Sequence, residues 1–585
     1  MTTVSRPFSS RLAVWCESVL SFAGASHWRA LLLLAGLTLA ACLPGFVTLQ
    51  PLDRDEPRFA QATKQMLETG DFIDIRFQEE ARHKKPVGIY WLQSGVVAAG
   101  EAVGIPEARK TIALYRLPSL AGIVALVIAT YWAATILLAD LTPAAARRAA
   151  FLAAGFMAVA ILPGVEARLA KTDAVLSACC AIAMAGLAHV YLNRNVPLRG
   201  GCFWAFWLAA AISVLVKGPI LLMVAGLAAL VLAIRERSAR WLLALRPGWG
   251  FLIIMALVLP WFIAISIKSG GAFFDESVGK DMLAKAQSGQ EKHWGPPGAY
   301  LLAFFGTFWP AAIFTAIGVY AFWRDRKLAP VAFCLAWVLP SWLIFEALPT
   351  KLPHYVLPLY PAIAILTARA IIMGDIHPRR PLAVPAALLI VLIPLVIGVG
   401  LSVFAWMYDG ARLWMAWPGF ALAIMLATLA WNAFRKDQAK ASAVLMIPAA
   451  LALSISVFGL AQPVIQALKI SPRLAAAAQS ANCEDVRLAT TRYREPSLIF
   501  LTRTDLLLTN GEGAADFLAE GGCRMAFVEA NDEPGFTTRL AEKGVSPALK
   551  TRVRGFNLNG GRLLDIGVYS VGERNPLPSP STQQE

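Results

Sequence analysis

Long apolar runs alternate with short polar connections through the first 465 residues of the chain. A helix that crosses a bilayer needs about 20 apolar residues. Runs of this kind predict thirteen transmembrane spans, near 28–49, 115–139, 148–165, 173–192, 203–216, 218–234, 249–268, 299–323, 329–347, 354–373, 382–406, 415–433 and 442–465. Lys217 interrupts one apolar stretch, so the two spans on either side of it could be a single broken helix. The span 148–165 is short for a membrane crossing.

Basic residues gather in alternate connections between these spans. Connections rich in Lys and Arg close to span ends stay in the cytoplasm. The connections of this kind contain Arg6, Arg11, Arg147, Arg148, Arg194, Arg199, Arg235, Arg237, Arg240, Arg246, Arg324, Arg326, Lys327, Arg379, Arg380, Arg435, Lys436 and Lys440. Residues 1–27 are therefore expected to be a cytoplasmic N-terminus, and the long polar segments 50–114 and 269–298 to lie outside. No cleavable signal peptide is evident in the first 26 residues, so the first span should remain as an anchor.

The character of the chain changes near residue 469. Short β-like runs at 485–493, 497–510, 523–530 and 561–572 alternate with helical patterns at 513–522 and 536–544. This alternation predicts a small α/β domain over residues 469–572, followed by a disordered Pro/Ser-rich tail, 573–585. An odd number of spans places this domain outside. Cys483 and Cys523 could pair there, although the sequence does not establish the geometry.

Composition agrees with a membrane protein. The chain is 57% hydrophobic and only 16% charged, with a mean hydropathy of +0.58, whereas soluble domains carry about 25% charged residues. The net charge of +15 is spread over short loops between apolar spans, which argues against nucleic acid as a partner and indicates membrane lipids, anionic ones in particular.

Candidate chemistry lies in the connections on the outer side. In the first of them, Phe59, Ala62, Met66 and Leu67 recur at helical spacing. This pattern predicts an amphipathic helix on the outer surface that begins at Asp55, with Arg58 one turn later.

The outer connections together supply two carboxylates and several cations. A carboxylate can accept a proton from a hydroxyl or phosphate nucleophile, and cations can hold a phosphate and stabilise it as a leaving group. The candidate residues are Asp55, Asp173, Arg58, Lys85, Lys217 and Lys351. Charges at span ends are most often solvated, but Lys217 has only Gly-Pro beside it between two apolar runs. These residues favour a phosphate donor that is itself embedded in the membrane.

The same segments carry a resemblance to a known family. "DEPRFAQATKQMLETGDF" followed by "KKPVGIYWLQ" resembles the first outer loop of the lipid A aminoarabinose transferase family, which belongs to the GT-C glycosyltransferases and is related to the protein O-mannosyltransferases. "TDAVL" from Thr172, "KGP" at Lys217 and "KLPHYVLPLYP" from Lys351 resemble further segments of that family in the right order, within residues 28–370.

The resemblance implies a polytopic α-helical GT-C fold with about thirteen spans and a C-terminal periplasmic domain. It implies inverting transfer of a sugar from undecaprenyl phosphate to lipid A or another envelope glycan, without a nucleotide cofactor, at the periplasmic face of the bacterial inner membrane. Asp55 would be the catalytic base, with Asp173 as the second candidate. The substrate-binding residues would be Glu56, Arg58, Lys85, Lys217, Lys351 and Tyr355.

One departure from the family bears on metals. Lys84 stands where the family commonly has a Glu before its Lys-Pro pair, so the metal site that some members build with that acid is not expected, and no metal is predicted.

Two alternatives stay open. A transferase of the same fold could modify a protein or a polysaccharide. A lipid or glycan transporter is the other possibility, but transporters concentrate charges midway across spans and often show repeated halves, and neither feature is evident here.

Overall fold

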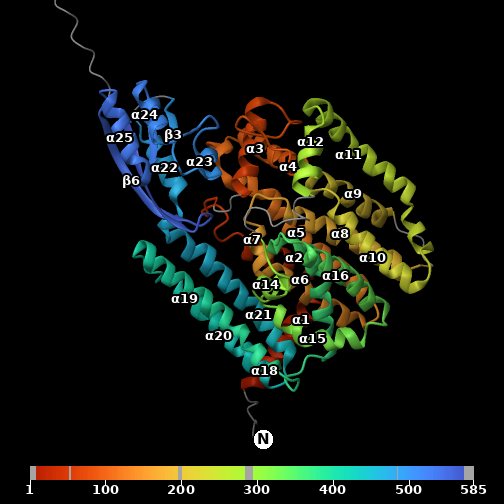
Figure 1. Cartoon of the computed structure of the whole chain (residues 1–585). Helices are drawn as coiled ribbons and strands as arrows, with labels where there is room; N and C mark the ends of the chain where they lie inside the picture. Colours follow the sequence, from red (N-terminus) through yellow and green to blue (C-terminus); the bar gives the residue numbers. More distant parts are fainter. Residues whose placement is uncertain are drawn as a thin grey trace, which may run out of the picture.

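The computed structural model describes residues 8–51, 55–194, 200–282, 294–481, 483 and 485–571. A large helical domain fills most of the molecule, and a small domain with a sheet sits at one end of it (Figure 1). Arg6, Arg199 and the predicted tail 573–585 lie outside the described residues.

Nine helical segments within the described ranges are long and apolar enough to cross a membrane. They are α5 (Ile112–Leu137), α8 (Asp173–Leu192), α9 (Gly200–Lys217), α11 (Pro247–Ser269), α16 (Ala329–Ala347), α17 with the turn before it (Pro353–Met373), α18 and α19 (Ala383–Asp409), α20 (Trp417–Arg435) and α21 with the turns after it (Ala439–Val464). Each matches a predicted span, so the chain is a multi-pass membrane protein.

The other four predicted spans fold as shorter or broken helices. They correspond to α2 (His27–Cys42), α6 (Pro143–Val159), α10 (Ile220–Glu236) and the pair α14 (Ala299–Thr307) and α15 (Ala312–Arg324). Around Lys217 the chain forms two helices, because Gly218 takes a φ of +78° and α10 starts directly after Pro219. The count of thirteen spans stays a prediction.

The N-terminal segment contains a helix that the sequence analysis did not predict. α1 (Phe8–Ala23) is bent by 109° from α2. The cytoplasmic location of residues 1–27 stays a prediction. Cys16 and Leu20 are buried on the side that packs against α6 and α21, while Trp15 and Phe22 are exposed. Together with α2, this helix is apolar enough to form a broken span or a re-entrant loop.

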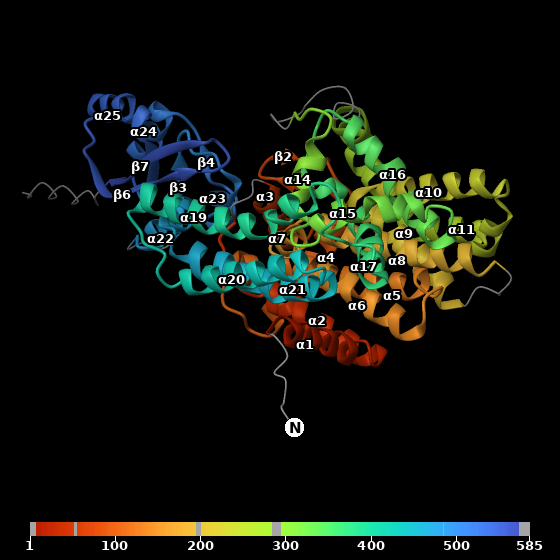
Figure 2. The same ribbon diagram turned by 90° about the horizontal axis from the view of Figure 1, so that it is seen from below.

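The helices differ in how deeply they lie in the bundle. α8 and α17 are mostly buried against other helices, α5 packs along α8, and α6 packs against α17. Only a small share of α19 and α20 is buried, and both lie on the same side as the small domain (Figure 2). Tyr408 of α19 packs against Phe556 of that domain, with ring centroids 4.8 Å apart.

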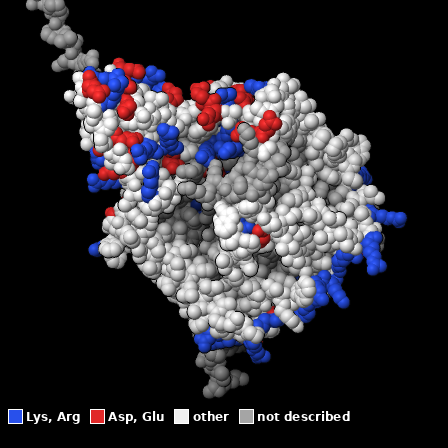
Figure 3. Space-filling model, in the orientation of Figure 1, with Lys and Arg blue, Asp and Glu red and all other residues white. Residues whose placement is uncertain are grey.

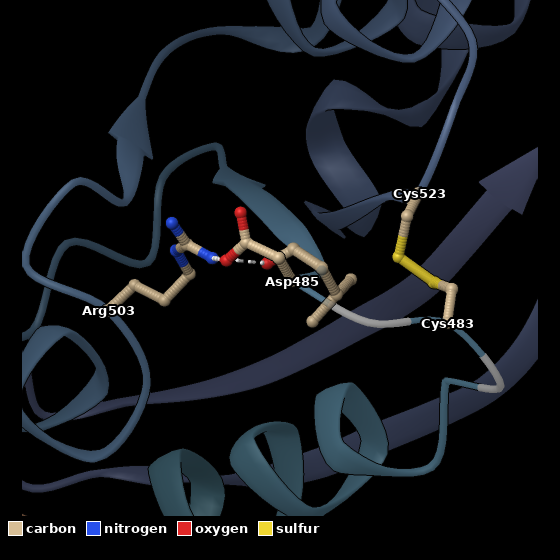
Figure 4. Close-up of a disulfide and its surroundings, with 5 residues drawn as sticks. Cys483, Asp485, Arg503 and Cys523 are labelled. Atoms are coloured by element: carbon tan, nitrogen blue, oxygen red, sulfur yellow. Dashed lines mark hydrogen bonds and ion pairs between the residues drawn. A yellow bond between two sulfur atoms is a disulfide. The ribbon is translucent and has the colours of Figure 1, made fainter.

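The small domain confirms the predicted α/β class. It contains α22 (Ile470–Gln479), β3 (Arg487–Thr490), α23 (Pro496–Leu501), β4 (Leu507–Leu508), α24 (Gly511–Ala519), β5 (Arg524–Glu529), α25 (Glu533–Glu542), β6 (Pro547–Asn557) and β7 (Arg562–Val571). The sheet order is β4-β3-β5-β7-β6; β3 runs parallel to β4 and β5, and β7 is antiparallel to β5 and β6. Cys483 and Cys523 form a disulfide across the neighbouring β3 and β5 segments, with Cα atoms 6.0 Å apart (Figure 4).

Two details of this domain differ from the sequence analysis. The β-like run 497–510 begins as α23, because Pro496 favours the first turn of a helix, and only Leu507–Leu508 pair as a strand. β6 and α22 were not predicted. The first half of β6 is largely exposed, so it lacks the clean alternation that identifies a strand, and it is held by pairing with β7.

The end of the molecule that carries the small domain also carries the first outer connection. This connection forms α3 (Asp55–Thr69), a hairpin of β1 (Arg76–Phe77) and β2 (Glu80–Ala81), and α4 (Gly88–Ala102). On the face shown in Figure 3, this end has both acids and bases, the middle has few charges, and the opposite end has mainly Lys and Arg. The distribution agrees with an outer small domain and inner basic loops.

α3 begins at Asp55, as predicted. The sequence analysis predicted that this helix lies on the outer surface, and that prediction is wrong. Most of its residues are buried between α4 on one side and α23 of the small domain on the other.

Candidate active site

A cavity of about 510 Å³ lies where α8 begins and α9 ends. Its polar residues are Lys84, Lys85, Asp173, Lys217, Ser277, Thr350 and His354. The rest of the lining is mainly apolar and includes Leu176, Val214, Met223, Phe262, Phe273, Phe274, Ile344, Phe345, Leu348 and Tyr355. A cavity with one cationic region and apolar walls suits a molecule with a phosphate at one end and a hydrocarbon chain at the other.

Two helix ends place the central ion pair of this cavity. Asp173 is the first residue of α8, and Lys217 is the last residue of α9. An acid at a helix N-terminus and a base at a helix C-terminus both complement the helix dipole. Lys217 Nζ donates to Asp173 Oδ1 and also lies 5.2 Å from the centre of the Tyr355 ring.

A row of buried ionisable groups continues from this pair. His354 Nε2 lies 3.8 Å from Asp173 Oδ2, and His354 Nδ1 lies 3.6 Å from Glu166 Oε1. Glu166 in turn pairs with Lys171 at 3.5 Å. The sequence analysis did not single out Glu166, Lys171 or His354. They lie in the segments 166–173 and 351–361, whose resemblance to family motifs was the available signal.

Asp55 lies within electrostatic range of this row. Its side chain is 42% exposed, and Arg58 Nη1 is 3.7 Å from its Oδ1. Partial burial opposes ionisation of Asp55, but the attraction of Lys171, Arg82 and Arg58 exceeds that effect and lowers its pKa. Asp55 is therefore ionised at neutral pH, as a proton acceptor must be.

A buried histidine supports the two lysines of the cavity. His83 directly precedes Lys84 and Lys85, and its Nε2 lies 2.8 Å from Asp74 Oδ1. The His83 ring also packs edge-on against Phe273, with centroids 5.7 Å apart. These contacts fix the backbone from which both lysines extend.

Comparison with known proteins gives relatives of one kind. The chain is 26% identical over 325 residues to the undecaprenyl phosphate-alpha-4-amino-4-deoxy-L-arabinose arabinosyl transferase of Pseudomonas aeruginosa (strain LESB58), covering 54% of this chain and 55% of the relative. The enzyme of the same name from Yersinia pestis (strain Pestoides F) is 24% identical over 324 residues, covering 54% of each. The match thus spans about half the length of these curated relatives. No protein-family model matches the chain.

Solved structures extend the similarity to nearly the whole chain. ArnT from Cupriavidus metallidurans, crystallised with undecaprenyl phosphate, superposes with a TM-score of 0.69 at 18% identity, covering 92% of this chain and 97% of that one. The chain has the ArnT fold. The apo form of the same ArnT gives a TM-score of 0.66. The predicted resemblance to the aminoarabinose transferases and the predicted GT-C fold are confirmed.

Glu56 was expected to bind substrate, but in this ArnT-like fold it lies in the protein core. Its side chain is fully buried and accepts hydrogen bonds from Arg116 Nε at 2.6 Å and Arg116 Nη2 at 3.0 Å. It also accepts from the backbone N–H of Ala170, while Arg116 Nη1 donates to the carbonyls of Phe46 and Leu49. Glu56 therefore joins α3, α5 and the segment before α8, and it does not line the cavity.

Lys351 is likewise not among the residues that line the cavity. Its Nζ donates to the carbonyls of Glu346 at 2.7 Å and Leu348 at 2.9 Å, and it pairs with the Glu346 carboxylate at 3.5 Å. It also lies 5.3 Å from the centre of the Tyr300 ring. Lys351 therefore lies beside Thr350 without lining the cavity. Lys85, Asp173, Lys217 and Tyr355 do line the cavity, whereas Asp55 and Arg58 are not among its lining residues. The roles of all these residues stay predictions.

Metal ligands were also considered. Within the part of the chain that the structure describes, no group of three or more His, Cys, Asp or Glu side chains could hold a metal ion. Lys84 places a cation, which repels metals, on the cavity wall. The expectation of a metal-free site stays a prediction.

Proposed function

We propose that the protein transfers a sugar from a polyprenyl phosphate, undecaprenyl phosphate in particular, to lipid A or another envelope glycan. The observation that carries this proposal is the cavity, where Lys84, Lys85 and Lys217 meet walls of Phe, Leu and Ile side chains. The names of the curated relatives and the undecaprenyl phosphate bound to ArnT support the same donor.

We expect transfer to occur by a single displacement at C1 of the sugar. An acceptor hydroxyl attacks C1 of the sugar, and the bond from C1 to the phosphate oxygen breaks. The electron pair leaves with the polyprenyl phosphate, whose charge the cavity lysines stabilise. The hydroxyl proton passes to the Asp55 carboxylate, and the configuration at C1 is inverted. Asp173 holds Lys217 through their ion pair and is the second candidate for the base.

The first expected result concerns the donor site. A hydrogen bond between Lys85 and the phosphate contributes about 1.5–3 kcal/mol. Lys85→Ala should therefore weaken the binding of undecaprenyl phosphate by about tenfold or more, measured on protein in lipid nanodiscs. Lys268→Ala is the matched control, because Lys268 pairs with Asp71 away from the cavity and should bind like the wild type. Equal affinities of Lys85→Ala and wild type would place the phosphate elsewhere.

The second expected result concerns orientation. We propose that the small domain and the site face the periplasm and that the protein lies in the bacterial inner membrane. The disulfide between Cys483 and Cys523 supports this side, since disulfides persist in oxidising compartments. A reporter enzyme that is active only in the periplasm should be active when fused after Val571. A reporter that fluoresces only in the cytoplasm should stay dark at the same position, and the reverse pattern would overturn the orientation.

A further inference from the structure

One side chain of the small domain is buried inside the membrane-anchored part of the molecule. Phe500 of α23 is fully buried in a cluster with Ala60 of α3, Val97 of α4, Tyr115 of α5 and Ala170. Its ring meets the Tyr115 ring edge-to-face, with centroids 5.2 Å apart. Phe500 thus fills the space where three outer elements and the segment before α8 converge.

Polar contacts from the same part of the small domain hold one face of α3. Lys64 Nζ donates to the Phe500 carbonyl at 3.2 Å, and the Lys64 side chain is only 4% exposed. Gln61 Nε2 donates to Thr504 Oγ1 at 2.9 Å, and Thr504 Oγ1 donates to Glu68 Oε2 at 2.8 Å. Residues 61, 64 and 68 follow helical spacing, so these bonds lie along a single stripe of α3.

The turn that carries Thr504 is held by further polar contacts. Arg503 Nε donates to Asp505 at 2.7 Å, and Arg503 also pairs with Asp485, near the disulfide at Cys483 (Figure 4). Gln78 Nε2 donates to the carbonyl of Thr504 at 2.8 Å. The turn is thereby connected to the disulfide-linked segment on one side and to the outer hairpin on the other.

Two of the segments in the Phe500 cluster carry the groups around Asp55. Ala60 lies on α3, whose first residue is Asp55, and Ala170 directly precedes Lys171. We propose that Phe500 and Thr504, together the α3 clamp, position Asp55 relative to Lys171 and so are positioning residues for sugar transfer. This proposal rests on the function proposed above. It gives the small domain a part in the reaction, although none of the described residues of that domain lines the donor cavity.

Transfer kinetics of purified protein in nanodiscs test the α3 clamp. Misplacing a catalytic group by about 1 Å can cost 100-fold in rate. Phe500→Ala should lower kcat by about tenfold or more, while the KM for the donor stays within about twofold, because the cavity residues are untouched. Phe500→Leu, which refills most of the space, should restore most of the rate. Leu563→Ala, at an exposed position on β7, is the control and should behave like the wild type.

The pH profile separates positioning from a general loss of folded protein. Lys171, Arg82, Arg58 and His354 all act on Asp55 to keep its pKa low. If α3 moves away from Lys171, part of this attraction is lost and the pKa of Asp55 rises. The acid limb of kcat should therefore move to higher pH in Phe500→Ala, whereas a smaller folded fraction would lower kcat equally at every pH.

Thr504→Val and amide hydrogen exchange provide a second variant and a second measurement. Thr504→Val removes one hydroxyl without opening a cavity and should shift the acid limb in the same direction, even if Phe500→Ala fails to fold. Amide hydrogen exchange over residues 55–69 should be faster in both variants. Unchanged exchange and unchanged kcat in Thr504→Val would overturn the α3 clamp. If the wild-type protein transfers no sugar, the proposed function is refuted. Amide hydrogen exchange over residues 55–69 would then be the test of the α3 clamp.

Discussion

Asp55→Asn is expected to lower sugar transfer by at least about 100-fold while donor binding and the amount of folded protein in the membrane stay normal. General acid–base catalysis contributes about 10²–10⁴-fold, and Asn keeps the shape of Asp but cannot accept the proton. The measurement is single-turnover transfer with saturating donor. The lowered pKa of Asp55 adds a pH signature: wild-type transfer should persist as pH falls through the ordinary range of a carboxyl group, and decline only near the lowered pKa.

Asp173→Asn provides the matched comparison. Asp173 is buried in the cavity wall and pairs with Lys217, so its loss should mainly weaken donor binding. If Asp55→Asn transfers sugar at nearly the wild-type rate and Asp173→Asn does not, Asp173 is the base. If both variants remain active, a general base is not needed and the proposed mechanism is wrong.

Arg116→Ala is expected to destabilise the folded protein by about 3–5 kcal/mol. Breaking a buried ion pair on one side leaves the other charge uncompensated, and here the charge left behind is the fully buried Glu56 carboxylate. The carbonyls of Phe46 and Leu49 lose their donor as well. Denaturant unfolding of the purified protein in detergent measures the change in the free energy of unfolding.

Arg109→Ala is the control for that experiment. Arg109 also pairs with a glutamate at 2.6 Å, but Arg109 and Glu101 are both exposed, so the loss should be below about 1 kcal/mol. A similar small effect of both substitutions would show that Glu56 and Arg116 do not hold the outer elements together.

The sequence predicts the transmembrane helices well because bilayer thickness imposes a length on each apolar run. α5, α8 and α11 are examples in which that length is visible without any tertiary information. The same criterion passes over α1, which is only 16 residues long and therefore too short to cross a bilayer alone. The pattern expected of a strand misreads α23, whose apolar residues are buried partly by contacts with α3.

The candidate site is predicted only in part, for a geometric reason. Asp55 and Glu56 are neighbours in sequence, but successive residues of a helix point about 100° apart. Glu56 therefore faces the core and Arg116, while Asp55 remains partly exposed near Lys171. Their common motif did not distinguish these two environments.

Long-range contacts explain the other site features that the sequence did not predict. The contact between Glu166 and His354 joins segments separated by nearly 190 positions, and no local pattern reveals it. In the irregular segment from Lys351 to Tyr355, no periodicity shows which side chains reach the cavity. The docking of Phe500 onto α3, α4 and α5 is equally invisible in the sequence.

Turnover of a defined donor by the wild-type protein tests the proposed function most directly. Purified protein in nanodiscs would receive a polyprenyl phosphate that carries a radiolabelled sugar, together with lipid A, a glycan or a peptide as the acceptor. The proposed function predicts that the label moves to lipid A or the glycan and that free polyprenyl phosphate accumulates in equal amount. Label found only on the peptide, or donor that stays intact with every acceptor while it crosses the bilayer, would contradict it.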